Sequence, residues 1–368
     1  MDGEEPRTEE EQEQVVTAKE SEAWTMKTSG KGLILDRYKN MKKLMVPRAY
    51  ITKSTGTPAP TAPLTRLLSH PWFKFPSVCV SSHRLKHSAK TMDDPILYKA
   101  NYHMQRRDVA NLLKKASNSS MLRHLPNQRV LDIGCGPGDT TCSLLLPFLP
   151  DDSQVVGVDI SPEMIRVARE TYKSNPRIEF QECNIEGCGI DIGDTLGQFD
   201  QIYSFWTFHW IQNQRVAFQN VHDLLKSDGE ILFLFLATSP VYNLFETIST
   251  YPRWSKYMED VKKFLSPFHG RSDPCAEVRH LAKTLNFQDI KCTLQNSTYE
   301  FPSMAALMKS IQAIDPFINR IPKDLKESFL SDYKAEIHQG MDGLVEASED
   351  GEGFIVRYKT ITLYASKL

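Results

Sequence analysis

Cysteine is scarce in this chain and shows no pairing pattern. The 368 residues include seven cysteines, at positions 79, 135, 142, 183, 188, 275 and 292, and no two of them form a Cys-x-x-Cys pair. This odd number at such spacings gives no basis for a disulfide framework or a zinc site, and the ten histidines show no ligand spacing either. The usage is typical of a reducing compartment, so we expect a cytoplasmic protein without a bound metal.

Long apolar runs are equally absent. The longest strongly apolar run covers residues 231–237, far below the ~20 residues that a membrane-spanning helix requires. The chain opens with Asp-Gly-Glu-Glu after its first methionine, whereas secretory signals need an apolar stretch and transit peptides are poor in acids. The sequence therefore predicts no membrane span and neither of these targeting segments.

Residues 1–91 lack sustained apolar periodicity. The first 22 residues carry nine acids and two bases, and residues 24–90 carry thirteen Lys or Arg and one acid, Asp36. Neither part can bury enough apolar surface to offset the entropy of ordering, so we expect a disordered extension, acidic and then basic. The basic part could contact nucleic acid or a membrane surface, but a solvated tail is the simpler interpretation.

Two further features of the whole chain bear on its organisation. Met92 resembles a natural start, so an alternative initiation site is a hypothesis. The formal net charge of −2 gives no partner signal, and nothing in the sequence indicates an oligomeric state.

A glycine-rich turn directly follows a short apolar strand at residues 129–133. The glycines of this turn are Gly134, Gly136 and Gly138. A dinucleotide-binding turn places its third glycine at the sixth position, which is Asp139 here. Asp132 lies at the end of the strand, where a carboxylate would repel phosphates but suits the ammonium group of an amino acid. Residues 154–160 read as a second strand that also reaches an acid, Asp159, 27 residues after Asp132.

This arrangement of glycines and acids resembles the first motif of class I S-adenosylmethionine-dependent methyltransferases. The resemblance implies that S-adenosylmethionine is the cofactor and that Asp159 lies where such folds grip the ribose hydroxyls. A glycine turn that merely packs would leave both strand-end acids unexplained.

Apolar periodicity predicts an α/β protein. Expected strands cover residues 129–133, 154–160, 178–185, 199–205, 231–236, 287–293 and 354–363; expected helices cover residues 106–118, 139–146 with a stop near Pro147, a segment from Pro162 capped by Ser161, and 213–227. Alternating strands and helices indicate a doubly wound, mostly parallel, seven-stranded Rossmann-like methyltransferase sheet whose last strand is antiparallel. The methyltransferase domain would cover residues 92–368.

Additional helical stripes exceed what a minimal cofactor domain needs. They cover residues 254–265, a segment behind Asp273 and Pro274 that runs to Leu285, and residues 325–337 behind Pro322. We expect an inserted helical cap, from about 241–285 and 303–340, over the carboxyl ends of the strands, where ligands of open α/β sheets bind. The alternative is that these are ordinary covering helices.

Aromatic side chains follow the fourth expected strand, in the run from Ser204 to Trp210. An apolar wall beside a methyl donor favours a small, apolar acceptor over nucleic acid or a protein arginine. Residues 98–108, 208–215 and 316–322 resemble the juvenile hormone acid O-methyltransferase family of arthropods, and the likeness covers residues 92–366. The resemblance implies an enzyme that forms methyl esters of sesquiterpenoid acids such as farnesoic acid or juvenile hormone acid.

The same resemblance implies roles for individual residues. Gln105 and Trp210 would hold the acceptor carboxylate, and His209 is the third candidate catalytic residue. Asp159 would hold the ribose, Met164 would pack on adenine, and Asn184, which stands where related enzymes usually have aspartate, would contact the adenine amine. The candidate cofactor-binding residues are Asp132, Gly134, Gly136, Gly138, Asp159, Ile160, Met164, Asn184, Ile185 and Ser204.

Structural interpretations of these residues stay open at this point. Gln105 could be a surface residue at a helix start, Trp210 and Met164 could be core side chains, and His209 is more simply structural than catalytic. Arg106 and Arg107 are most simply a solvated helix start.

A carboxylic acid acceptor makes modest chemical demands. Its pKa of about 4 to 5 leaves it ionised at neutral pH, so no general base is required. The site must align the carboxylate with the methyl donor and exclude water; we expect neither a covalent intermediate nor a metal. Two alternatives stay open: a methyltransferase acting on another fatty or small carboxylic acid, and a non-catalytic S-adenosylmethionine-binding protein.

Overall fold

A computed structural model describes residues 94–119, 121–187, 196–339, 343–349 and 351–368. The expected extension at residues 1–91 and the possible start at Met92 lie outside the described residues.

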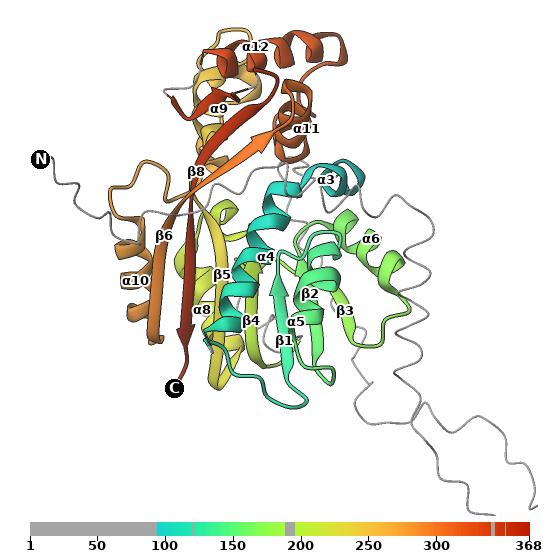
Figure 1. Cartoon of the computed structure of the whole chain (residues 1–368), viewed down its shortest axis with the longest axis vertical. Helices are drawn as coiled ribbons and strands as arrows, with labels where there is room; N and C mark the ends of the chain where they lie inside the picture. Colours follow the sequence, from blue (N-terminus) through green and yellow to red (C-terminus); the bar gives the residue numbers. More distant parts are fainter. Residues whose placement is uncertain (1–93, 120, 188–195, 340–342, 350) are drawn as a thin grey trace, which may run out of the picture. The chain divides into compact units, whose positions relative to one another are not determined.

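The described part is built on one mostly parallel sheet (Figure 1). Its strands are β1 (Arg129–Ile133), β2 (Gln154–Asp159), β3 (Ile178–Glu182), β4 (Phe199–Phe205), β5 (Leu225–Thr238), β6 (Gln288–Phe301), β7 (Val345–Ala347) and β8 (Phe354–Ser366). The strand order is β3-β2-β1-β4-β5-β8-β6, with β7 paired to β8 beside this path. The first five strands are parallel, and β8 pairs antiparallel with both β5 and β6. The predicted fold class and its antiparallel last strand are confirmed.

Residues of the central strands alternate between two hydrophobic clusters. In β5, Ile231, Phe233 and Phe235 belong to one cluster, whereas Leu232, Leu234 and Leu236 belong to the other. The continuous apolar run in the sequence therefore reflects a strand that is covered on both faces, as parallel sheets require.

The helices cover both faces of the sheet. They are α3 (Pro95–Asn101), α4 (His103–Asn118), α5 (Leu146–Phe148), α6 (Pro162–Tyr172), α8 (Gln214–Leu224), α9 (Pro240–Ser249), α10 (Pro274–Thr284), α11 (Met304–Ile314) and α12 (Lys326–His338). Buried residues of α4 and α5 join one cluster, and those of α8 and α10 join the other. This two-sided cover is the doubly wound arrangement that the sequence predicts.

Several helix boundaries follow the predicted capping chemistry. The side chain of Ser161 accepts a hydrogen bond from Met164 N, and that of Asp273 accepts one from Ala276 N, so both predicted N-caps are confirmed. The predicted stop near Pro147 is confirmed to within one residue: a π-helical turn at Thr141–Leu145 leads into α5, which contains this proline and ends at Phe148. The wider turn already interrupts the regular hydrogen-bond ladder, so the missing N–H of proline costs little there.

Helix α8 ends earlier than expected. It stops at Leu224, and Leu225 already belongs to β5. The predicted extension of this helix to residue 227 is therefore wrong. Lys226 explains part of the difference, because its ammonium group pairs with Asp200 at 2.8 Å and ties the chain to β4.

Helices α9, α11 and α12 gather at one end of the sheet, together with the far ends of β6 and β8 (Figure 1). The segment Phe354–Tyr358 of β8 pairs with β6 and β7, whereas its pairing with β5 begins at Lys359. The hairpin of β6 and β8 therefore extends past the parallel strands and forms part of the cap. The sequence pattern predicts the helices of this cap but not the contribution of the two strands.

Two expectations for the cap are wrong. Residues 254–265 form no α-helix but two short 3-10 helices, Ser255–Tyr257 and Val261–Phe264, separated by non-helical backbone at Met258 and Asp260. Trp254 and Met258 of the predicted stripe are nevertheless buried. Helix α10 packs against β6 and α8 and covers the sheet, so for this helix the alternative interpretation holds. Helices α9 and α11 were not predicted as separate elements.

Candidate active site

A cavity of about 300 Å³ opens at the carboxyl ends of the parallel strands, beneath the cap. Its wall combines Gly134 and Asp159 from the ends of β1 and β2 with residues of the turn after β4 and with cap side chains. Ten of the thirteen predicted site residues line it: Gln105, Gly134, Gly136, Asp159, Ile160, Met164, Asn184, Ile185, His209 and Trp210. The topology thus brings together residues that lie more than a hundred positions apart in the sequence.

The glycine turn is held against the end of β2. Asp159 Oδ2 accepts a hydrogen bond from Gly136 N and Asp159 Oδ1 accepts one from Ser161 N, both at 2.9 Å. Gly134 has φ +76°, and a Cβ at this position would lie 1.9 Å from Thr207 Oγ1. Only glycine fits such a turn without displacing the turn after β4.

Asp132 lies beside a smaller cavity of about 30 Å³ that adjoins the first. It is buried, and Thr141 Oγ1 donates a hydrogen bond to its Oδ2 at 2.6 Å. Burial raises the pKa of Asp132 to about 7, against the hydrogen bond from Thr141, which lowers it, and Asp159 raises it further. A buried carboxylate of this kind gains from a cationic partner, as the ammonium group of an amino acid would be.

Apolar residues form the opposite wall of the cofactor side. Met164 is buried on α6, and Ile160, Ile185 and Met164 all line the cavity. Asn184 Oδ1 accepts a hydrogen bond from Glu186 N at 3.0 Å. Its carboxamide is therefore already fixed by the local turn, and one lone pair of the oxygen remains for a ligand.

Two predicted cofactor residues do not reach either cavity. Ser204 is buried in β4, and its hydroxyl donates to Ile133 O at 2.8 Å. A Cβ at Gly138 would lie 2.6 Å from the Phe180 ring, so this glycine allows β3 to pack closely on the turn. The structure places both residues in the support of the site and not on its surface.

Gln105 points into the cavity from the first turn of α4. It is 6% exposed, and its Oε1 has no hydrogen-bond partner among the described residues. The alternative of a surface position at a helix start is therefore wrong. A buried amide with an unused acceptor is costly unless a ligand or water completes it.

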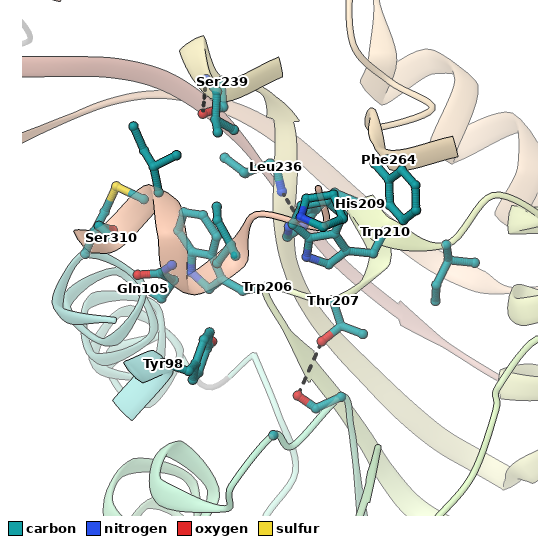
Figure 2. A pocket seen from close by; sticks show the side chains of 18 of the residues that line it. Tyr98, Gln105, Trp206, Thr207, His209, Trp210, Leu236, Ser239, Phe264 and Ser310 are labelled. Atoms are coloured by element: carbon teal, nitrogen blue, oxygen red, sulfur yellow. Dashed lines mark hydrogen bonds between the residues drawn. The ribbon is translucent and has the colours of Figure 1, made fainter. Parts of the chain in front are cut away.

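His209 and Trp210 lie on the short 3-10 turn Phe208–Trp210 after β4. Leu236 N donates to His209 Nδ1 at 3.3 Å (Figure 2). Burial lowers the pKa of His209 to about 3, so the ring is neutral and carries its proton on Nε2. The imidazole packs against both Trp206 and Trp210. His209 is thus a neutral group on the cavity wall.

The part of the cavity under the cap is mostly apolar. It is lined by Val241, Leu244, Phe301, Leu307, Ile311, Ile314, Ile337, Val345 and Val356, with the hydroxyls of Ser239 and Ser310 among them. These side chains come from α9, α11, α12 and the extended strands of the cap. Such a lining suits a long apolar ligand with a polar end.

The sequence interpretation left several cavity residues without a role. Tyr98, Trp206 and Thr207 line the cavity, and Trp206 also lines the smaller one. Trp206 lies inside the aromatic run that the sequence highlights, so its position was visible. Its direction depends on a backbone φ of 57°, which no local pattern predicts.

Arg107 fixes the helix that carries Gln105. Its guanidinium donates to Asp108 Oδ1 at 2.8 Å, Tyr358 OH at 2.7 Å and Thr298 O at 2.8 Å, and Tyr358 OH donates to Asp108 Oδ2 at 2.6 Å. This cluster, Arg107, Asp108 and Tyr358, joins α4 to β6 and β8. The interpretation of Arg107 as a solvated residue is wrong, although Arg106 is partly exposed and reaches Ser143.

Among the described residues, no group of three or more His, Cys, Asp or Glu is arranged to hold a metal ion. Within the same ranges, no helix combines the length and apolar character needed to cross a membrane.

Comparisons with known proteins agree with this architecture. Residues 130–229 match a family described as a methyltransferase domain. The chain is 34% identical over 282 residues to the juvenile hormone acid O-methyltransferase of Bombyx mori, covering 75% of this chain and 98% of that protein. It is 32% identical over 277 residues to the protein of the same name from Drosophila melanogaster, covering 75% and 93%. A more distant relative is the malonyl-[acyl-carrier protein] O-methyltransferase 1 of Ilyobacter polytropus, 25% identical over 61% of this chain and 73% of that protein.

Proposed function

The chain belongs to the juvenile hormone acid O-methyltransferase family, and on this premise we propose that it forms the methyl ester of a sesquiterpenoid acid, farnesoic acid or juvenile hormone acid. That it is an S-adenosylmethionine-dependent O-methyltransferase follows from the family itself. One observation supports the finer assignment most: a single cavity joins the glycine turn and Asp159 to a long aliphatic chamber, with Gln105 and Trp210 on its wall.

The residues of the cofactor side fit the cofactor of the family. Asp159 would hold the ribose hydroxyls, and Asp132 would pair with the amino group. Met164 and Ile185 would pack on the base, with Asn184 beside its amine. The buried, protonatable Asp132 is the structural reason for this assignment, because it lacks a cationic partner nearby in its own small cavity.

The acceptor side would orient a carboxylate and not activate it. S-adenosylmethionine, when bound, supplies a methyl group on a positively charged sulfur. Gln105 and the Trp210 indole are neutral donors that can orient a carboxylate oxygen without the strong pairing that an arginine would impose. Because the acid is ionised at neutral pH, no residue of the site needs to remove a proton.

The uncharged residues of the site would also help the carboxylate to attack the methyl group. His209 stays uncharged because of its burial, and the residue lines the cavity. The aliphatic cap side chains would exclude water that otherwise solvates the carboxylate. The binding of the apolar chain would then place the reacting oxygen in line with the methyl donor.

An acid other than a sesquiterpenoid is the second candidate. The aliphatic chamber specifies an apolar chain but not its branching, and the more distant relative from Ilyobacter polytropus carries the name of a methyltransferase for a malonyl carrier protein. The two candidates share Gln105, Trp210 and the carboxylate chemistry.

Mass spectrometry of the products tests the proposal. Purified protein is incubated with S-adenosylmethionine and farnesoic acid, and in parallel with a panel of other fatty acids. We expect methyl farnesoate as the main ester. If only other acids give esters, one of them is the substrate and the proposed mechanism still holds. If no ester forms although the cofactor binds measurably, the non-catalytic alternative is favoured.

We also propose that the protein is cytoplasmic. The five cysteines in the described part of the chain are free thiols, as is usual in a reducing compartment. Fractionation of native tissue with immunoblotting tests this, and recovery in a secreted or organelle fraction would contradict it.

A further inference from the structure

Trp206 occupies an unusual backbone conformation at the end of β4. Its φ is 57°, in the left-handed region that bulky residues rarely adopt. Trp206 N donates to Leu234 O at 2.7 Å, and its ring lies against Tyr358 and His209. The surrounding structure therefore holds this indole in one orientation. Such strain persists where a side chain must point in a particular direction.

The indole nitrogen of Trp206 is buried without a partner. Its Nε1 has no hydrogen-bond acceptor among the described residues, and the whole residue is 7% exposed. An indole N–H can only donate. Leaving a buried donor unsatisfied is unfavourable, so the group calls for an acceptor that arrives from outside the chain.

Trp206 meets Gln105 where the two cavities join. Both residues line the large cavity and the small one, and Figure 2 shows the Gln105 carboxamide beside the Trp206 indole, with His209 and Trp210 on the other side of that indole. Gln105 Oε1 also lacks a partner. This junction lies between the chamber that holds the apolar chain and the wall that carries Asp132.

We infer that Trp206 Nε1 donates a hydrogen bond to the carboxylate of the acceptor acid, beside Gln105. The inference rests on the proposed function and adds a donor to it. A carboxylate is an acceptor-only group and matches an indole N–H and an amide N–H that lie together. Trp210 lines the same cavity beyond the His209 ring, so both indoles border the space proposed for the acid. The neutral surroundings leave the unbound carboxylate oxygen free to attack.

A second carboxylate could use the same donor. The amino-acid part of the cofactor also carries a carboxylate, and Trp206 lines the small cavity near Asp132. The position of Trp206 at the opening of the aliphatic chamber favours the acceptor. The two sources are separated by adding the ligands one at a time.

Indole resonances report this hydrogen bond directly. The chain has five tryptophans, so the ¹⁵N-labelled full-length protein gives up to five Nε1–H signals, and Trp206→Phe identifies the one of interest. We expect it to move downfield when farnesoic acid is added to the S-adenosylhomocysteine complex, and to stay in place with methyl farnesoate. A shift with S-adenosylhomocysteine alone, or no shift with the acid, overturns the inference.

Kinetics provide the second readout. Trp206→Phe keeps an aromatic ring and removes the donor, and we expect kcat/KM for the acid to fall roughly 10- to 100-fold, with the KM for S-adenosylmethionine within about twofold of the wild type. The matched control is Trp254→Phe, because Trp254 Nε1 bonds Asp332 at 2.5 Å away from the cavity lining. This control should leave kcat/KM unchanged at temperatures where it is folded.

The two proposals fail in different ways. An active wild type with an equally active Trp206→Phe protein would overturn the role of Trp206 and leave the proposed function standing. A wild type that shows the indole shift but forms no ester would overturn the proposed function alone. If Trp206→Phe does not fold, Phe variants of the other four tryptophans, at positions 24, 72, 210 and 254, assign the Trp206 signal by elimination, and that signal still decides the binding question.

Discussion

Burial decides the protonation of individual residues in this site. Asp132 and His209 are both almost fully buried, and burial raises the pKa of the acid to about 7 and lowers that of the imidazole to about 3. Each shift favours the neutral form, because a charge loses its hydration inside the protein. The sequence shows which residue types stand at these two positions, but it does not show the burial that shifts their pKa values.

Asp132 should make cofactor affinity depend on pH. Pairing with an ammonium group requires the carboxylate, so below about pH 7 Asp132 must first release a proton. We expect the affinity for S-adenosylhomocysteine to fall as the pH is lowered through 7, by up to about tenfold per pH unit. Calorimetric titrations from pH 5.5 to 8.5 measure it. Asp132→Asn should bind weakly with a flat profile, and a flat wild-type profile would contradict the assignment.

His209 should make the stability of the protein depend on pH, in the opposite sense to an acid whose pKa is raised. Its folded pKa lies below its unfolded value, so its stabilising effect is complete above about pH 6.5 and is lost as the pH falls toward 3. Asn in its place can still accept from Leu236 N. The wild type should have a larger free energy of unfolding than His209→Asn at neutral pH. We expect this difference between the two proteins to shrink by up to about 1.4 kcal/mol per pH unit below pH 6.5. Urea unfolding at pH 7.5, 6 and 5 checks this, and a constant advantage would argue against a neutral His209.

Trp210 should matter for the acceptor and not for the cofactor. Phe at position 210 keeps an aromatic wall but removes the indole donor, so we expect turnover to be nearly abolished while S-adenosylhomocysteine binding stays within about twofold. Initial rates with farnesoic acid and calorimetry measure the two quantities. Equal activity of the variant would remove Trp210 from the carboxylate site.

At the scale of elements, α4 is the helix on which the proposed acceptor site depends. It carries Gln105 and is tied to β6 and β8 by the cluster of Arg107, Asp108 and Tyr358. Arg107 also lies over the Tyr299 ring at 4.8 Å. The side chains of Arg107 and Asp108 are 14% and 11% exposed, so solvent screens their pair little.

This cluster should be strongly coupled. Arg107→Gln leaves the Asp108 carboxylate buried without its cation, and we expect the free energy of unfolding to fall by about 3–5 kcal/mol. Adding Asp108→Asn should recover part of that loss, because the buried charge is removed as well. A double-mutant cycle by chemical denaturation measures the coupling. Additive losses would show that the two side chains act independently.

At the scale of the described molecule, the cap closes the cavity over the sheet. Trp254 and Arg253 both reach Asp332, which joins the segment after α9 to α12, and the β6–β8 hairpin supplies the remaining wall. The match to the Bombyx mori protein covers 98% of that protein but 75% of this chain.

A shortened protein beginning at Met92 should therefore keep the enzyme intact. We expect the same kcat/KM and a thermal midpoint within about 2 °C of the full-length chain, since 75% of this chain already matches nearly the whole length of the Bombyx mori protein. Activity assays and calorimetry compare the two, and immunoblotting shows which size is native. A loss of activity on shortening would assign a role to residues 1–91.

The sequence by itself determined the sheet and the cofactor side. Alternating burial in the strands, the caps at Ser161 and Asp273, and the acids at the ends of β1 and β2 are local patterns, because each depends on neighbours within a few residues. Topology then places the carboxyl ends of parallel strands together. These features were predictable without coordinates.

Only the tertiary structure decided the acceptor side. The burial of Gln105, the direction of Trp206 and the ion pair of Arg107 depend on contacts with β5, β6 and β8, more than a hundred residues later in some cases. The stripe at residues 254–265 has helical periodicity, yet burial of Trp254 and Met258 in the cap is achieved with two short 3-10 helices. Local periodicity records which side chains are buried, whereas long-range packing determines what they are buried against.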